Sequence, residues 1–111
     1  VIHLNSGDEK VQRFALNNFR YLYQEVGRVH LRFELLVHGA GLTLLTKKDS
    51  VLATELAQLK TASDIEFTAC SNTMKAQGLT RADLIDQVDR TVPAMVRLME
   101  LQEQGWSYIK P

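Results

Sequence analysis

Cys70, the single cysteine of the chain, is the side chain in this sequence best suited to chemistry. It ends an apolar segment over residues 65–70 that is typical of a buried strand. It directly precedes Ser71-Asn72-Thr73, which are typical of a helix start. The partial positive charge of a helix N-terminus favours the thiolate, which is the form that attacks sulfur or carbon. The competing interpretation is a small buried side chain without chemistry, because free cysteines are among the most buried residues.

Other polar and glycine-rich groups lie at the ends of predicted strands. His38 and the loop Gly39-Ala40-Gly41 follow a predicted strand over residues 30–37, and Asn5-Ser6-Gly7 follows another over residues 1–4. The C-terminal ends of parallel strands share one edge of a sheet, where ligands bind. We therefore expect one pocket at that edge, formed by Asn5, Ser6, His38, Gly39, Gly41, Cys70, Ser71 and Asn72.

The role of His38 has two interpretations. Its imidazole titrates near neutrality, so beside a thiol it would donate a proton or a hydrogen bond. The alternative is a ring that only bonds a backbone carbonyl at the strand end. We assign no role to His3 or His30. Three scattered histidines and one cysteine have no metal-ligand spacing, so we expect no metal site.

The sequence carries no recognisable cofactor motif. The loop over residues 39–41 lacks the third glycine of a dinucleotide fingerprint, and neither a P-loop nor a GxSxG motif is present. We therefore expect no cofactor and exclude NTPases and serine hydrolases. The loop is short enough to form either a small anion-binding nest or a tight turn.

Hydrophobic periodicity predicts the elements that position these groups. The longest is a helix over about residues 8–26, begun by a capping box between Ser6 and Glu9. The others are a helix capped by Asp49 or Ser50, a short helix after Cys70, a strand over residues 88–92, a helix from Pro93, and a strand over residues 106–109. This alternation predicts a flavodoxin-like α/β fold: a single compact domain over residues 1–111, with a mostly parallel sheet and helices on both faces.

Two carboxylates, Glu34 and Glu66, fall inside predicted strands. A charge inside a covered sheet needs a partner, and Arg32 is a candidate for Glu34. We interpret these residues as a solvated or subunit-facing edge rather than as acid–base catalysts.

The helix over residues 8–26 has an unusually wide apolar surface. With Phe14 and Tyr21 on one flank and Leu16 and Tyr23 on the other, its apolar arc spans roughly 220°, against about 100° or somewhat more for a helix that only faces a core. This width predicts a homo-oligomer, in which the aromatic flank is buried against another subunit. The alternative is that these aromatic side chains lie on the surface of a monomer.

Composition excludes some functions and sets expectations for others. Thirteen basic and thirteen acidic residues give a net charge of zero, which argues against a nucleic-acid-binding protein. No apolar run approaches the roughly 20 residues of a membrane helix, so we expect no membrane partner. One reduced cysteine is typical of a cytoplasmic protein. The chain begins at Val1 rather than Met, so a periplasmic protein whose export signal was removed is the alternative.

The order of several segments adds a family resemblance. The segments are His3-Leu4-Asn5 and residues 33–41, 67–73 and 101–111. Together they resemble the DsrE/DsrF-like family, which includes YchN-like proteins and sulfur-relay subunits, over essentially the whole chain. The resemblance implies an α/β fold assembled as trimers or hexamers. It also implies that Cys70 carries persulfide sulfur between proteins, with His38 and the loop over residues 39–41 in a pocket beside it.

These observations lead to two main hypotheses. In the first, the chain is a sulfurtransferase or sulfur carrier: the Cys70 thiolate takes a sulfane sulfur from a donor protein and passes it to an acceptor thiolate. In the second, the chain is a non-catalytic oligomeric protein that binds a small ligand or anion in the pocket. A third and weaker hypothesis is a nucleotide-linked flavodoxin-like protein, which the lack of a phosphate-binding loop in the sequence disfavours. The exposure of Cys70 separates the first two, since a sealed thiol leaves only binding.

Overall fold

The computed structural model describes residues 1–27 and 31–111 and confirms the expected α/β fold. Its centre is a four-stranded sheet in the order β1-β2-β3-β4, with every neighbouring pair parallel. The strands are β1 (Ile2–Leu4), β2 (Glu34–Val37), β3 (Glu66–Cys70) and β4 (Arg90–Val92). The helices are α1 (Glu9–Val26), α2 (Ala53–Ala62), α3 (Ser71–Ala76) and α4 (Ala94–Glu103), with 3₁₀ segments η2 (Gly39–Leu45) and η3 (Arg81–Asp83).

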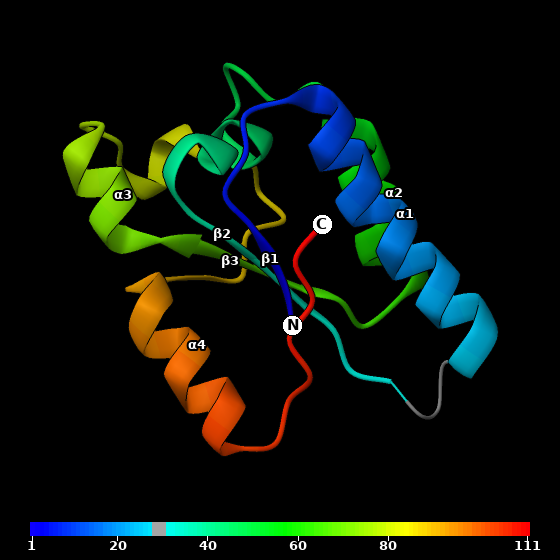
Figure 1. Cartoon of the computed structure of the whole chain (residues 1–111). Coiled ribbons are helices and arrows are strands. Elements are labelled where there is room, and N and C mark those ends of the chain that lie inside the picture. The colour runs from blue at the N-terminus through cyan, green and yellow to red at the C-terminus, as the bar shows by residue number, and fades with distance from the viewer. Residues whose placement is uncertain (28–30) are drawn as a thin grey trace.

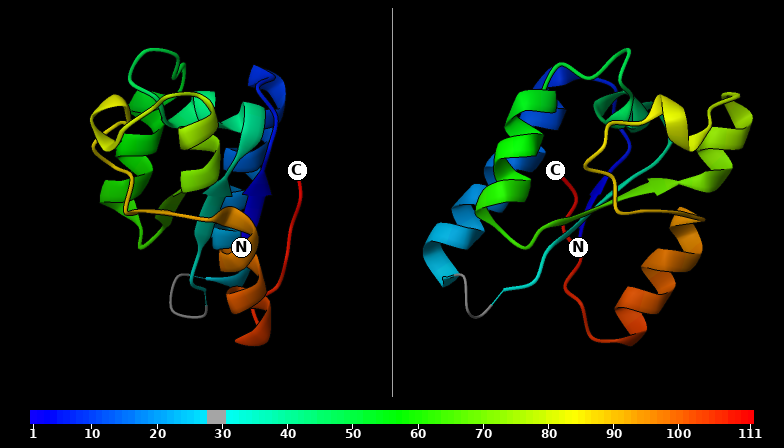
Figure 2. Two further views of the ribbon diagram at one scale, coloured as in Figure 1. Left: turned by 90° about the vertical axis from the view of Figure 1, so that its left-hand side faces the viewer. Right: turned by 180° about the vertical axis from the view of Figure 1, so that it is seen from behind.

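The direction of the chain across the sheet places helices on both faces. Helix α1 connects β1 to β2, and α2 connects β2 to β3, so the chain moves across the sheet in the same direction both times. Because both crossovers are right-handed, the two helices lie on the same face of the sheet. After β4 the chain returns through α4 to β1, where Ile109 pairs in parallel with Ile2. This return step runs in the opposite direction and puts α4 on the other face (Figure 1). Figure 2 shows the C-terminal segment running alongside β1.

The period of two along each strand divides the interior into two apolar clusters. Leu35 and Phe67 point to the larger cluster, under α1 and α2. Leu36 and Cys70 belong to a smaller cluster, which also contains Ala94 and Leu101 of α4. Cys70 therefore lies on the α4 face of the sheet, which the sequence pattern alone did not indicate.

Several predicted boundaries were wrong. Within the described residues the second strand begins at Glu34, and His30 of the predicted strand lies outside the described residues. The predicted strand over residues 106–109 is reduced to the single bridge at Ile109, and the strand predicted over residues 88–92 is confined to Arg90–Val92.

The predicted helix caps also need correction. Asp8, rather than Ser6, caps α1, because its carboxylate accepts a hydrogen bond from the Lys10 amide at 2.8 Å. Ser6 instead accepts a hydrogen bond from the Asp8 amide through its hydroxyl. Leu52 occupies the N-cap position of α2, so neither Asp49 nor Ser50 caps that helix.

Glu34 is buried, contrary to the predicted solvated or subunit-facing edge. Its carboxylate accepts two hydrogen bonds from Arg97 of α4, at 2.9 and 2.7 Å, and one from the Thr68 hydroxyl at 2.7 Å. Arg90 completes the cluster by pairing with both Glu34 and Glu66. Arg32, the predicted partner, lies over the Trp106 ring instead. This buried ion cluster joins α4 to β2, β3 and β4.

The outer surface keeps large apolar side chains exposed on both helical layers. Phe14 and Tyr21 of α1 are each 63% exposed, and Met99 of α4 is equally exposed. The described helices include none with the length and apolar character needed to cross a membrane.

We predict that Arg97→Ala lowers the free energy of unfolding by about 3 kcal/mol at pH 7, because it leaves the buried Glu34 carboxylate with one cationic partner fewer. Burial raises the pKa of Glu34, but hydrogen bonds from Arg97 and Thr68 and the charges of Arg90 and Arg97 outweigh it and lower the pKa overall. The stabilisation is therefore present above the unfolded pKa of about 4.3 and is lost as the pH falls through the folded value.

Denaturant titrations at several pH values measure this effect. The matched control is Arg13→Ala, which removes an exposed pair with Glu9 and costs at most about 0.5 kcal/mol. Equal losses for the two variants, or a loss from Arg97→Ala that does not shrink in acid, would contradict the role given to Glu34.

Candidate functional site

The Cys70 sulfur lies where the ends of three elements meet. Cys70 is the last residue of β3 and the N-cap residue of α3, so the helix begins at Ser71, where a helix start was predicted, and none of Ser71, Asn72 and Thr73 is its N-cap. The Ala94 amide, at the start of α4, donates a hydrogen bond to Sγ at 3.4 Å. Only 5% of the residue is exposed. The thiol is therefore held inside the α4 face rather than presented on an open rim.

The hydrogen bonds around Cys70 favour its ionised form. Burial raises the pKa of the thiol, but hydrogen bonds from the Thr73 amide, the Ala94 amide, the Thr73 hydroxyl and the Asn72 amide outweigh it and lower the pKa. Amides from two separate chain segments thus converge on one sulfur atom. This arrangement stabilises a thiolate without a cationic partner.

His38 leaves the sheet beside Cys70. Val37 and Ala69 are register partners across β2 and β3, so His38 and Cys70 are the next pair in the same direction. The His38 backbone is still extended, with φ −144° and ψ 172°, so strand alternation continues through it. Its side chain therefore falls on the face of Leu36, which is the face that also holds Cys70. The structure brings these two predicted site residues to the same edge and the same face.

A second histidine, His3 of β1, lies next to His38. The Nε2 atom of His3 lies 2.7 Å from Nδ1 of His38, and the two rings stack with their centroids 4.7 Å apart. On its other side, Nδ1 of His3 lies 2.5 Å from the hydroxyl oxygen of Tyr108 in the C-terminal segment. His3 is buried, His38 is half-buried and Tyr108 is exposed.

The environment keeps both imidazole rings uncharged near neutral pH. Burial, the neighbouring His38 ring and the Lys110 charge lower the pKa of His3 to about 4. Burial and Lys110 also lower the pKa of His38. A neutral ring has one nitrogen that donates and one that accepts, which suits a chain of hydrogen bonds between two rings.

The glycine-rich loop brings the ends of β1 and β2 into contact. A Cβ atom on Gly41 would lie 2.9 Å from the Leu4 carbonyl oxygen and 3.1 Å from Asn5 Cα, so only glycine fits there. Gly39 has a φ of 58°, in the left-handed region that favours glycine. Its amide donates a hydrogen bond to the Thr73 hydroxyl oxygen at 3.0 Å. The loop therefore packs on Asn5 and also supports the residue that bonds to Cys70.

Other predicted pocket residues lie at this edge without joining the cysteine through their side chains. The Ser6 hydroxyl accepts a hydrogen bond from the Asp8 amide, just before α1, and Asn5 is exposed. Ser71 is half-buried, and exposed Asn72 contributes its backbone amide rather than its side chain. Of the predicted residues, Gly39 is therefore linked to Cys70 by hydrogen bonds through Thr73. His38 is placed beside Cys70 by the strand register.

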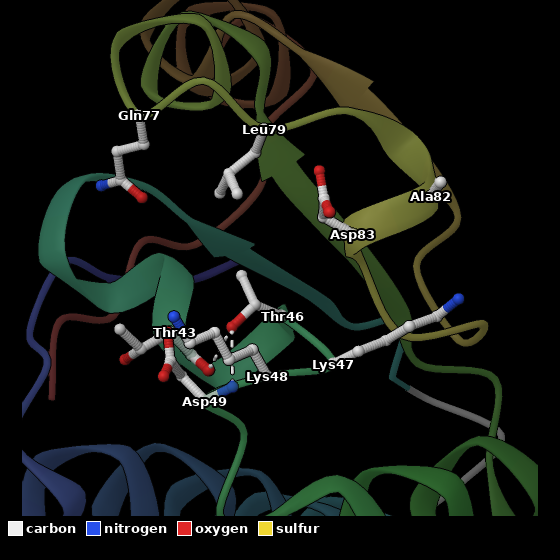
Figure 3. Close-up of a pocket in the computed structure, with 9 residues that line it drawn as sticks. All are labelled: Thr43, Thr46, Lys47, Lys48, Asp49, Gln77, Leu79, Ala82 and Asp83. Atoms are coloured by element: carbon white, nitrogen blue, oxygen red, sulfur yellow. Dashed lines mark hydrogen bonds between the residues drawn. The ribbon is translucent and has the colours of Figure 1, made fainter.

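Two hollows of the described surface lie away from the cysteine. A polar hollow of about 350 Å³ lies between η2 and the segment after α3, and Figure 3 shows the side chains that line it. Its lining residues are Thr43, Thr46, Lys47, Lys48, Asp49, Gln77, Leu79, Ala82 and Asp83. A second hollow, of about 660 Å³, is an apolar groove along α4 lined by His3, Met95, Leu98, Met99, Gln102, Glu103 and Tyr108. Cys70 is not among the lining residues of either hollow.

Sequence reasoning missed His3, Thr73, Ala94 and Tyr108. The signal for His3 was its place in β1: a parallel sheet in chain order sets β1 beside β2, and alternation then puts His3 on the His38 face. Tyr108 had no comparable signal, because it reaches His3 from 105 residues away.

Comparisons with known proteins agree with this architecture. A protein-family model described as the DsrE/DsrF-like family matches residues 5–111. A solved structure from Methanobacterium thermoautotrophicum, described as a protein of unknown function, MTH1491, is similar with a TM-score of 0.86 and 28% sequence identity. The similarity covers 99% of this chain and 96% of that one. The search of curated proteins found no match.

We predict that Thr73→Val raises the pKa of the Cys70 thiol, because it removes the hydroxyl that bonds to sulfur while it keeps the side-chain volume and the amides that also bond to sulfur. The ultraviolet absorbance of the thiolate, titrated against pH with Cys70→Ser as the blank, measures this shift. Thr73→Ser keeps the hydroxyl and is the matched control. A Thr73→Val protein that titrates like the wild type would show that the hydroxyl does not bond to the sulfur.

Proposed function

Because its residues 5–111 match that family model, the chain belongs to the DsrE/DsrF-like family, and we propose that it is a sulfur carrier or sulfurtransferase acting through Cys70. The family is associated with sulfur relay. The observation that carries the proposal for this chain is the set of hydrogen bonds from Asn72, Thr73 and Ala94, which lower the pKa of the only thiol.

The proposed chemistry is transfer of a sulfane sulfur. The Cys70 thiolate attacks the terminal sulfur of a donor persulfide, an S–S bond forms at Sγ, and the donor leaves as a thiolate. An acceptor thiolate then attacks the outer sulfur of the Cys70 persulfide and restores the cysteine. Both steps resemble thiol–disulfide exchange, whose rate depends on thiolate fraction and access. The proposed partners are therefore a donor and an acceptor of persulfide sulfur.

Sulfur transfer requires that a donor reach the Cys70 sulfur atom, and this atom is nearly buried. With 5% of Cys70 exposed, a donor has to reach Sγ through a narrow opening or after a small displacement of α3 or α4. This burial favours a second candidate, a protein that binds a small ligand or anion without catalysis. The polar hollow with Lys47, Lys48 and Gln77 is where an anion would bind in that case.

We predict that the protein gains about 32 Da, one sulfur atom, on incubation with polysulfide or thiosulfate, and that a reductant removes it. Intact-mass spectrometry measures the gain. Cys70→Ser should fold and show no gain, because no other thiol exists. Ser71→Ala, a neighbouring change that keeps the thiol, should load normally.

Two results would favour the ligand-binding candidate over sulfur transfer. In one, the wild-type protein never gains sulfur while its thiol alkylates normally. In the other, no alkylating reagent reaches Cys70 unless the protein is denatured.

We also propose that the chain is a homo-oligomer, a trimer or hexamer, that buries the exposed aromatic flank of α1. Replacing both Phe14 and Tyr21 by Ser should give a smaller species in light scattering at micromolar concentration, because the change removes apolar interface area. Arg20→Ser on the same helix is the control and should not change the mass. A wild-type protein that is a clean monomer would contradict the proposal.

A further inference from the structure

The side chains of Tyr108, His3, His38 and Cys70 form a row across one face of the sheet. The row begins in the C-terminal segment, crosses β1 and the end of β2, and finishes at the end of β3. Hydrogen bonds join Tyr108 to His3 and His3 to His38. The strand register and alternation place His38 beside Cys70, since neighbouring strands lie about 4.8 Å apart. Titratable groups from three other segments of the chain are therefore aligned with the nucleophile.

We propose that His38 is the proton acceptor for the Cys70 thiol, and that His3 and Tyr108 are positioning residues that hold the His38 ring in the required orientation and tautomer. This inference rests on the proposed sulfur-transfer function. It adds two residues for which sequence reasoning found no role. The arrangement follows the general pattern of nucleophile, base and a third group that orients the base.

The hydrogen-bond pattern permits the tautomer that the proposal needs. The two contacts fit either direction of donation. In the direction that the proposal takes, Nδ1 of His38 donates to Nε2 of His3, and Nδ1 of His3 donates to the Tyr108 oxygen. In this pattern Nε2 of His38 keeps its lone pair and is free to accept a proton. If His3 were apolar, Nδ1 of His38 would have no partner in the row, and no hydrogen bond there would fix the plane of the ring.

The proton and electron pairs balance in the loading step. The Cys70 thiol gives its proton to Nε2 of His38, and the thiolate attacks the sulfane sulfur of a persulfide donor. The new S–S bond forms at Sγ while the S–S bond of the donor breaks. The departing donor thiolate takes the proton back from His38, so the ring is neutral again and no oxidant or reductant is consumed.

Other charged groups also face this side of the sheet. Lys110 acts on both rings and opposes their protonation. Glu34, Arg90 and Arg97 lie on the same face, where they are paired with one another in the buried ion cluster. Lys110→Gln therefore serves as a charge control, because its effect on His38 is opposite in sign to the loss of His3.

The test compares an apolar with a hydrogen-bonding replacement of His3. His3→Leu removes the ring nitrogens, whereas His3→Gln keeps a terminal amide that can bond to Nδ1 of His38. The readout is the pH titration of thiolate absorbance, with Cys70→Ser as the blank, and it uses no sulfur donor. We expect the thiolate fraction at pH values below the midpoint to fall about tenfold in His3→Leu, one pKa unit, and to stay close to wild type in His3→Gln.

Tyr108→Phe keeps the test decisive if His3→Leu fails to fold. It removes one hydroxyl from an exposed side chain and should lower the thiolate fraction in the same direction by about threefold, half a pKa unit. An unchanged titration in a folded His3→Leu or Tyr108→Phe protein would overturn the inference. Equal shifts in His3→Leu and His3→Gln would also overturn it, because they would show a packing role alone.

The two proposals fail in distinguishable ways. If the titration shifts as expected but no sulfur is loaded, sulfur transfer is wrong and the coupling of His38 to the thiol stands. If sulfur is loaded and the titration is insensitive to His3, the carrier function stands and the positioning row is wrong.

Discussion

The parallel pairing of β1, β2 and β3 determines where each group of the site lies. One set of backbone hydrogen bonds fixes Leu4 beside Val37 and Val37 beside Ala69, so the three strands end at a common edge. Strand alternation then decides which side chains share a face. A slip of one residue in either ladder would send His38 or Cys70 to the opposite face of the sheet. The row of polar side chains therefore depends on backbone register before it depends on any side-chain contact.

The environment of Cys70 is a balance between two opposing effects. Removing a thiolate from water is unfavourable, and the burial of Cys70 alone would keep it protonated. Amides at the starts of α3 and α4 supply hydrogen bonds that outweigh this cost. Helix α4 is held over the sulfur by the bonds between Arg97 and the buried Glu34 carboxylate. The ion cluster and the thiol are thus parts of one arrangement, although they lie at opposite ends of the same strands.

Local sequence patterns predicted the parts of this structure that local interactions determine. The α/β fold, the helix over residues 8–26 and the place of Cys70 between a strand and a helix all follow from periodicity and from the residue types beside each boundary. The common edge of the strand ends follows from parallel topology alone.

The contacts that define the site could not be predicted in the same way. Arg97 meets Glu34 from 63 residues away, and Tyr108 meets His3 from 105 residues away. The cap of α1 is Asp8, one of several adjacent polar residues, whereas no side chain caps α2, and the local sequence did not distinguish these outcomes. The burial of Cys70 depended on α4 crossing the second face of the sheet, which only the return of the chain to β1 establishes.

A crystal structure of the protein soaked with polysulfide tests the central claim most directly, because it locates any transferred sulfur atom. The account predicts density for a second sulfur about 2.05 Å from Cys70 Sγ, the length of an S–S bond. It also predicts that this density lies on the α4 face within reach of His38. An unmodified Cys70 in crystals that hold polysulfide elsewhere, or a sulfur atom attached on the side away from His38, would contradict it.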